Sequence, residues 1–467
     1  MFKNRVATFL IVLILVPLAT LAVIQLAKGY RPDPKTRKLR PTGLLVAQST
    51  PPAADVTVNG KPTGKTNNTT NLDPGSYLVK IAKPGFRPWS KTLTIEKELV
   101  TYATALLIPE TLVPQPLLTG QDSVSATSLS ATKSKLAFAI LPPQPTGTLE
   151  PKIPPSPTTP LNTSKSNQTD SATTSPSRPR EGIYVFEPTD SIFKSNKLPK
   201  QISTALPKTN LSHAHIVWSP DEKQILVRTP RDPRCADFDA VKNPCAIQSA
   251  YLLDATKFND SPQNVASTYK PIVGNWQSQN KLLLNENLGR IPKNLQRVIS
   301  QSAKDIVFSG DQSKFLYTAT SSATLPDHII PPVPAANSQS QNRRLDPGGI
   351  YVYDVKEDRN YKLGQLPPIP PKSKPRPVKN QPTPTPVFDA SALSFAWFPT
   401  NRHLIAASNG QAYLVEYDAT NPTPLISNPD LFPIIPPSIS SRVYLILESK
   451  TGPTPGQKLV FLDLKPD

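Results

Sequence analysis

The stretch VWSPDEKQILVRT, from Val217 to Thr229, decides the fold of most of this chain. It consists of an apolar run, a short polar turn with a lysine, and a second apolar run, which is the pattern of a β-hairpin. Variants of this phrase recur along the chain, and they begin at Ser128, Phe308 and Trp397, with a weaker one, NWQSQNKLLLN, at Asn275. Repeats of this kind predict one small supersecondary unit that recurs along the chain.

A second apolar phrase follows most of the copies and supplies a further strand. It begins at Gly182, Ala250, Gly349, Ala412 and Lys458. The paired phrases predict four-stranded antiparallel sheets, each with too little apolar surface to be stable alone, so neighbouring sheets must stack.

The turn of the clearest copy carries a resemblance to known repeat proteins. Ser219, Pro220, Asp221 and Lys223 match the typical turn of TolB-like and WD-repeat-like β-propellers, although glycine is absent after Asp221. The fold expected for 120–467 is therefore a degenerate β-propeller of five or six blades. No amphipathic helix is expected in it.

Proline-rich inserts interrupt the repeats. The copy at Trp397 joins its two phrases through the tight hairpin 408–411, and the same connection is enlarged in the other copies, at 141–181, 230–249, 321–347 and 450–457. Equivalent loops of a propeller emerge on one face, so we expect these insertions to crowd one rim and to meet a partner there. The low-complexity inserts are expected to have no fold of their own.

A further insert, 366–387, lies between two predicted blades. It is rich in proline and carries lysine and arginine without an acidic residue. Its composition fits a stiff solvated linker or, as the alternative, a basic polyproline-type ligand for a groove or an anionic polymer.

Residues 42–108 form a smaller unit with strands of alternating polarity. Asn59-Gly60 predicts a hairpin turn that needs positive φ. The tetrapeptide PPAA at 51–54, then VTVNG, then LDPGSYLVKIAKPGF resemble the PEGA domain, a small β-sandwich family, with Ala53 where glycine is usual. The resemblance implies an extracytoplasmic spacer or binding domain without catalytic residues. Trp89 is expected to pack in its core or at its edge.

An apolar run of about 22 residues, from Val6 to Ala27, follows a short tail at 1–5 and predicts a transmembrane helix at 6–27. A cleaved signal peptide is the alternative. The basic linker 28–41 comes next, and we expect its cations to contact an anionic surface: Lys28, Arg31, Lys35, Arg37, Lys38 and Arg40. Their count favours a cytoplasmic C-terminal portion. The polar inserts favour an extracytoplasmic one, which we expect.

The composition limits the kinds of partner. The chain has 57 prolines against 18 glycines, which favours extended linkers over flexible ones. Its net charge of +18 is spread along the chain or collected in linkers, without a platform of stacked aromatics, so nucleic acid is not expected. The expected partners are a membrane and an envelope protein or an anionic cell-wall polymer.

The residues that could carry chemistry are few. Cys235 and Cys245 could form a disulfide in an oxidising compartment or remain two thiols. His213 and His215 could share one face of a strand, but no third ligand is evident, so no metal or other cofactor is expected. No phosphate loop, nucleophile elbow or HExxH motif occurs. An enzyme is therefore not expected.

Taken together, the sequence predicts an all-β, membrane-anchored protein of the cell envelope that binds or scaffolds a partner through its propeller loops. A degenerate envelope hydrolase or lyase that uses the propeller funnel is one alternative. A cytoplasm-facing assembly platform is the other.

Overall fold

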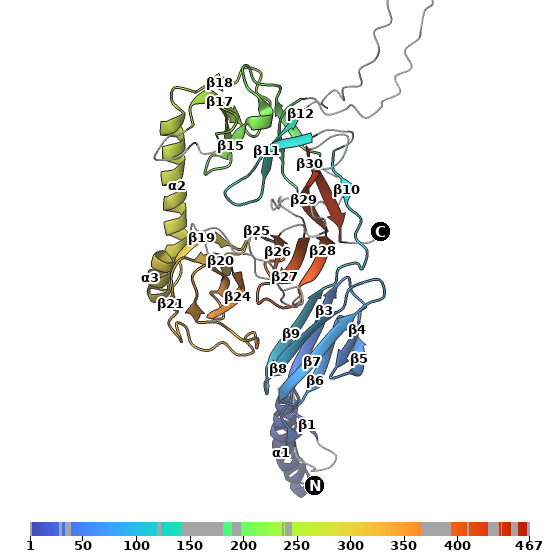
Figure 1. The fold of residues 1–467 in the computed structure, drawn as a ribbon. Coiled ribbons are helices and arrows are strands. Elements are labelled where there is room, and N and C mark those ends of the chain that lie inside the picture. The colour runs from blue at the N-terminus through green and yellow to red at the C-terminus, as the bar shows by residue number, and fades with distance from the viewer. Residues whose placement is uncertain are drawn as a thin grey trace, which may run out of the picture. The chain divides into compact units, whose positions relative to one another are not determined.

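A computed structural model gives the fold, which is mostly β (Figure 1). It has two compact units. The first comprises Met1–Pro114, Lys281–Val443 and Leu462–Asp467, and the second comprises Gln115–Asn280 and Tyr444–Phe461. The structure describes residues 2–27, 30–32, 39–118, 123–141, 181–188, 198–235, 238, 245–365, 394–408, 411–427, 439, 441–449 and 456–464.

The chain begins with helix α1 (Phe2–Ala27), after which β1 (Arg31–Pro32) pairs with β2 (Leu39–Arg40). The described apolar side chains of α1 between Phe9 and Ile24 are exposed. A membrane span needs about 20 consecutive apolar residues. No helix within the described ranges meets the length and apolarity for crossing a membrane, so the transmembrane helix predicted at 6–27 is not supported.

The next seven strands form the predicted small β-sandwich. One sheet has the order β6-β3-β9 and the other the order β5-β4-β7-β8. Alternate side chains, among them Leu45, Ile81 and Ala103, fill the core between them. The strands are β3 (Gly43–Thr50), β4 (Asp55–Val58), β5 (Lys61–Lys65), β6 (Asn68–Leu72), β7 (Gly75–Ala82), β8 (Trp89–Ile95) and β9 (Val100–Leu106).

Two turns of this sandwich can be compared with the sequence. Asn59 and Gly60 have φ values of 48° and 80°, which confirms the predicted hairpin turn. Ala53 has a φ of 61°, so the chain adopts the left-handed conformation there with alanine in place of the usual glycine.

The second unit contains two antiparallel sheets that share a core. Strands β11 to β14 are part of a seven-stranded sheet, β15 to β18 form a four-stranded one, and Ile183, Trp218 and Leu253 are among the residues buried in their core. The strands are β11 (Ser123–Leu129), β12 (Leu136–Leu141), β13 (Gly182–Phe186), β14 (Lys200–Ser203), β15 (His215–Trp218), β16 (Gln224–Pro230), β17 (Ile247–Asp254) and β18 (Gln263–Asn264).

The first of these sheets also joins the beginning and the end of the repeat region. Strand β30 (Gly456–Asp463) pairs with β29 (Arg442–Ser449), with β11 and with β10 (Gln115–Pro116), where Gln115 opposes Phe461. Strand β10 precedes the predicted start of this region at residue 120. An early strand therefore pairs with the last one.

The first unit contains two further four-stranded antiparallel sheets. Their orders are β19-β20-β23-β24 and β25-β26-β27-β28, and Val352, Tyr361 and Leu404 are buried between them. The strands are β19 (Ala303–Phe308), β20 (Lys314–Ala319), β23 (Gly349–Asp354), β24 (Arg359–Gln365), β25 (Ser394–Trp397), β26 (His403–Ser408), β27 (Gln411–Glu416) and β28 (Thr423–Ser427). Such sheets are consistent with propeller blades.

The turn between the first two strands has the same backbone in all four sheets. Its fourth residue is left-handed, with φ between 55° and 57°, and this residue is Lys133, Glu222, Gln312 or Asn401. Neighbouring turns are connected through it: Asn401 Oδ1 accepts from the N–H of Gly310 at 2.8 Å, and Glu222 Oε1 accepts from the N–H of Thr132 at 2.8 Å. The segments that repeat in the sequence therefore also form the same turn and the same kind of contact between neighbouring turns.

The enlarged connections occupy equivalent places in the sheets. The predicted inserts 141–181, 230–249 and 321–347 each join the second to the third of four neighbouring strands in a sheet, and 450–457 joins β29 to β30. Most of 141–181 lies outside the described residues, as does 366–387.

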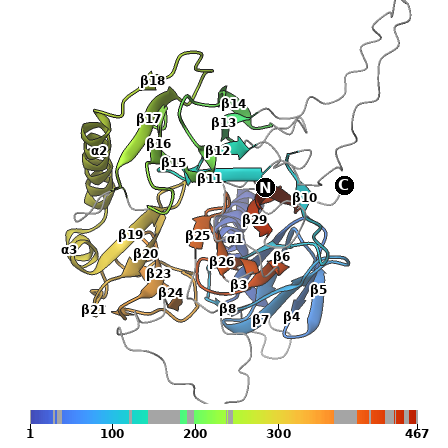
Figure 2. The same ribbon diagram turned by 45° about the horizontal axis from the view of Figure 1, so that its top comes forward.

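Two helices correct the expectation of an all-β chain. Helix α2 (Tyr269–Gly289) replaces the hairpin predicted at Asn275, and α3 (Lys293–Ser302) follows it. Helix α2 lies beside the sheet of β15 to β18 (Figure 2). Tyr269, Val273 and Trp276 recur at helical spacing and pack against this sheet. Leu295 and Ile299 of α3 pack on Phe315 and Tyr317. The leucines at 282–284 were interpreted as a strand, because a short apolar run can belong to either a strand or a helix.

The expectation that insert 321–347 has no fold of its own is also wrong, because the structure shows this insert folded. It contains the paired strands β21 (Ala323–Thr324) and β22 (Arg344–Leu345), and Leu325 is buried. The guanidinium of Arg343 lies 3.2 Å from Asp327 and 2.8 Å from Asp358. The composition of this segment predicted no fold, but these contacts hold it in a defined conformation.

Candidate functional site

The two histidines named as weak metal candidates differ in their surroundings. His213 ends the short 3-10 helix Leu211–His213 and is exposed, whereas His215 lies at the start of β15. Burial lowers the pKa of His215, and the nearby Arg228 lowers it further. Within the described part of the chain, no group of three potential metal ligands occurs.

The two cysteines form a disulfide between Cys235 and Cys245, with a Cα–Cα distance of 5.7 Å. Of the basic linker, Arg31 and Arg40 are described. They oppose each other in the β1–β2 pair, and Arg40 lies 3.9 Å from Asp73. The other cations, Lys28, Lys35, Arg37 and Lys38, lie outside the described residues.

The most elaborate polar site is a junction in the first unit, where β8 of the sandwich meets the turn after β27. Lys91 has a side chain that is 5% exposed, and its Nζ lies 2.8 Å from Glu416. It also pairs with Asp418. The indole N–H of Trp89 donates to Glu416, and Asn421 Nδ2 donates to the same carboxylate at 2.9 Å. Each buried charge in this group therefore has partners, as burial requires.

Insert 321–347 completes this junction. The side chain of Asn337 donates to Asp418 and, at 3.0 Å, to the hydroxyl of Tyr417. Ser338 and Gln339 bind the free backbone edge of β8, because Thr94 N–H donates to Ser338 Oγ at 3.3 Å and Gln339 Nε2 donates to Thr92 O at 2.7 Å. The insert thus covers a sheet edge that would otherwise offer unpaired groups.

Burial and charge set the protonation states here. Burial tends to raise the pKa of Asp418, but the Lys91 ammonium and hydrogen bonds outweigh it and hold that pKa below its usual range. Burial lowers the pKa of His403 to about 4, and its Nδ1 lies 2.8 Å from Thr400 Oγ1. Neutral pH therefore leaves His403 uncharged and Asp418 ionised.

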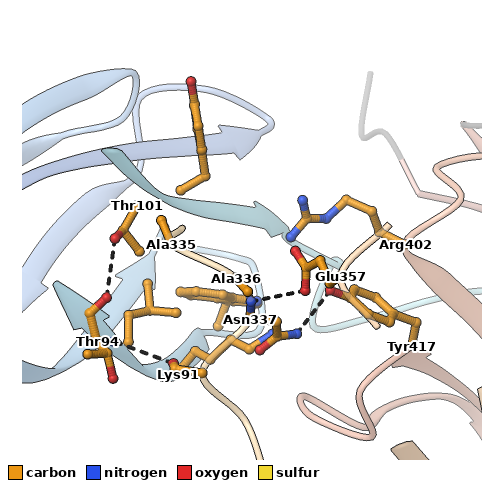
Figure 3. Close-up of a pocket in the computed structure, with 13 residues that line it drawn as sticks. Lys91, Thr94, Thr101, Ala335, Ala336, Asn337, Glu357, Arg402 and Tyr417 are labelled. Carbon is orange, nitrogen blue, oxygen red and sulfur yellow. Dashed lines mark hydrogen bonds between the residues drawn. The ribbon is translucent and has the colours of Figure 1, made fainter. Parts of the chain in front are cut away.

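A cavity of about 130 Å³ adjoins this junction (Figure 3). Its polar lining includes Arg402, Glu357, Asn337, Thr94 and Thr101. A larger, more open groove of about 840 Å³ shares three of the lining residues and runs on between the β8–β9 turn and the proline-rich segment 332–334. The shared residues are Thr94, Ala336 and Ser338.

The arrangement suits binding more than catalysis. In the junction, Lys91 and its carboxylates are mutually paired and enclosed, so none is placed to transfer a proton to a substrate. The sequence analysis missed Lys91, Asn337, Glu357 and Arg402. One signal was present: Lys91 occupies an inward position in WSKTLTI, whose buried positions alternate with exposed ones.

A comparison with known protein families identifies the sandwich. Residues 42–110 match the PEGA domain, and this match confirms the resemblance seen in the sequence. The matched segment ends two residues beyond the predicted boundary at 108. No curated protein sequence matches the chain.

Solved structures give remote matches. One is an acylaminoacyl peptidase from Pyrococcus horikoshii (10% identity, TM-score 0.19), of which 40% is covered, against 74% of this chain. A structure from work on two prolyl endopeptidases is 9% identical (TM-score 0.17, 85% of this chain and 40% of that one), so the chain spans well under half of both. A putative TolB from Agrobacterium tumefaciens is 9% identical (TM-score 0.17, 89% and 99%).

Proposed function

We propose that this chain is a non-enzymatic protein of the cell envelope, in which a PEGA domain and a degenerate propeller present enlarged loops to an envelope protein or an anionic envelope polymer. The observation that carries the proposal is the behaviour of insert 321–347. It occupies the same connection as the other insertions, and through Ser338 and Gln339 it already binds β8 of the neighbouring sandwich. An enlarged loop of this set therefore acts as a recognition element.

The arrangement of the sheets as a propeller is also part of this proposal. The four-stranded sheets, the contacts between neighbouring turns and the pairing of β10 with β30 support a ring of blades. In a ring, equivalent connections share one face, so the insertions would gather on a single binding rim.

An extracytoplasmic place at the cell membrane is also proposed. The disulfide between Cys235 and Cys245 supports it, because disulfides persist in oxidising compartments. The exposed apolar side chains of α1, from Phe9 to Ile24, need a cover, and lipid would provide it. This attachment does not depend on α1 crossing the bilayer.

The test of the function is capture of partners by the full chain in mild detergent, with envelope proteins and isolated cell-wall polymer offered separately. We expect one of them to be retained and to be lost when residues 231–246 are replaced by a short Gly-Ser connection that leaves β16 and β17 intact. Turnover of a substrate by the intact chain with no retained partner would contradict the proposal. Protease treatment of intact cells tests the location, because extracytoplasmic loops would be cleaved.

A further inference from the structure

The cavity beside Lys91 is lined by two ionisable groups that have no ionic partner. Arg402 lies in the turn before β26, and Glu357 lies in the turn between β23 and β24; both are half-buried. Glu357 accepts one hydrogen bond, from the N–H of Asn337 at 3.0 Å. Among the described residues, neither side chain is within ion-pair distance of an opposite charge. Both residues line the cavity, and in the view of Figure 3 their charged ends point toward one another.

The other charges around the cavity are already balanced within the protein. Lys91 is held by Glu416 and Asp418, and Lys314 lies 3.2 Å from Asp354. These pairs are enclosed, so they leave Arg402 and Glu357 as the charged groups available to a ligand. One presents donors to an anion, and the other accepts from a cation.

The cavity is small and has further polar groups. Its volume is about 130 Å³, well above the roughly 10–15 Å³ that a single water needs. Hydroxyls of Thr94, Thr101 and Ser338 line it, and it shares residues with the larger groove, which gives a small ligand a path from solvent.

We propose that this cavity binds a small zwitterion of the α-amino acid class, with the ligand carboxylate on the guanidinium of Arg402 and the ligand ammonium on the carboxylate of Glu357. A molecule with both charges satisfies both side chains at once, whereas a simple anion or a simple cation leaves one unpaired. An amino acid of the size of glycine or alanine fits the volume. Insert 321–347, one of the enlarged loops, supplies part of the lining, but the proposal does not depend on what those loops bind.

The state of Glu357 agrees with this assignment. Burial raises its pKa above the usual range, and the neighbouring carboxylate of Asp354 acts in the same direction. The N–H of Asn337 and the cations Lys314 and Arg359 lower this pKa but do not outweigh burial. A bound ammonium would favour the ionised form further.

Isothermal titration of the full chain with glycine, L-alanine and D-alanine tests the proposal. At least one of them should bind with a dissociation constant of millimolar order or lower, and acetate and methylammonium should each bind about tenfold more weakly or worse. Arg402→Gln and Glu357→Gln should each weaken amino acid binding about tenfold or more, because each removes one charge-assisted contact. Lys97→Gln, which alters the groove and not the cavity, should leave it unchanged.

Several results would overturn the assignment. They are absence of amino acid binding by a chain that unfolds cooperatively at the usual temperature, acetate binding as tightly as glycine, and unchanged binding in both variants. Glycylglycine binding more tightly than any free amino acid would also exclude a free amino acid as the ligand. Arg402→Lys, which keeps the charge, should retain more affinity than Arg402→Gln; equal loss in two folded variants would remove the guanidinium from the site.

Discussion

Lys91 and Glu416 are 325 positions apart in the chain, yet Lys91 Nζ lies 2.8 Å from the Glu416 carboxylate and the two side chains are 5% and 2% exposed. The pair fastens the PEGA domain to the end of β27. A buried ion pair of this kind contributes little compared with an apolar contact of the same size, but it is costly to break, since the remaining charges stay buried.

Substitution of Lys91 should therefore destabilise the first unit strongly. In Lys91→Met, the carboxylates of Glu416 and Asp418 lose their cation, and we expect a loss of about 3–5 kcal/mol in the free energy of unfolding. Urea denaturation measures it. Lys65→Met is the matched control, because Lys65 pairs with Asp55 at the exposed surface of the same domain. A loss of the same size in both variants would contradict the role given to Lys91.

His403 should make the stability of the first unit depend on pH. Its pKa is about 4 in the folded chain and about 6.5 when unfolded, so the unfolded state binds the extra proton between these values. Stability is therefore complete above pH 6.5 and falls as the pH drops toward 4, by about 2 kcal/mol between about pH 7 and about pH 5. The free energy of unfolding, measured across this pH range, should depend less on pH in His403→Gln. The exposed His328, changed to Asn, should leave the profile as it is.

Ala53 should be improved by glycine. It is exposed and has a φ of 61°, a conformation that costs an L-residue about 1 kcal/mol or more. We expect Ala53→Gly to gain about 0.5–1 kcal/mol, less the entropy that glycine adds to the unfolded chain, and Ala53→Val to lose stability. Thermal unfolding of both variants checks the sign. Stabilisation by valine would show that the left-handed turn does not form.

The disulfide should stabilise the second unit by about 2–3 kcal/mol, because it closes a loop with a sequence separation of 10. Reductant should lower the unfolding midpoint of the native chain. It should have no effect on a chain carrying Cys235→Ser and Cys245→Ser. Mass spectrometry before and after reduction and alkylation reports the pairing directly, and two free thiols in protein from an oxidising compartment would contradict it.

The sequence by itself was sufficient wherever neighbouring residues decide the structure. Alternating polarity defined the strands of the sandwich, and short apolar runs defined those of the repeated sheets. Asn59-Gly60 defined the hairpin turn of the sandwich, because turn dihedrals depend on adjacent residues. The position of the enlarged connections followed from counting residues between strands. Even the error at α2 was local, since Tyr269, Val273 and Trp276 already had helical spacing.

Only the tertiary structure decided which distant groups meet. WSKTLTI shows a lysine at an inward position, but no local pattern shows that its partners are Glu416 and Asp418, or that insert 321–347 folds against β8. The cavity lined by Arg402 and Glu357 also forms only because distant segments meet. Its walls come from the sandwich, the insert and three separate turns, and long-range packing alone determines that such segments come together.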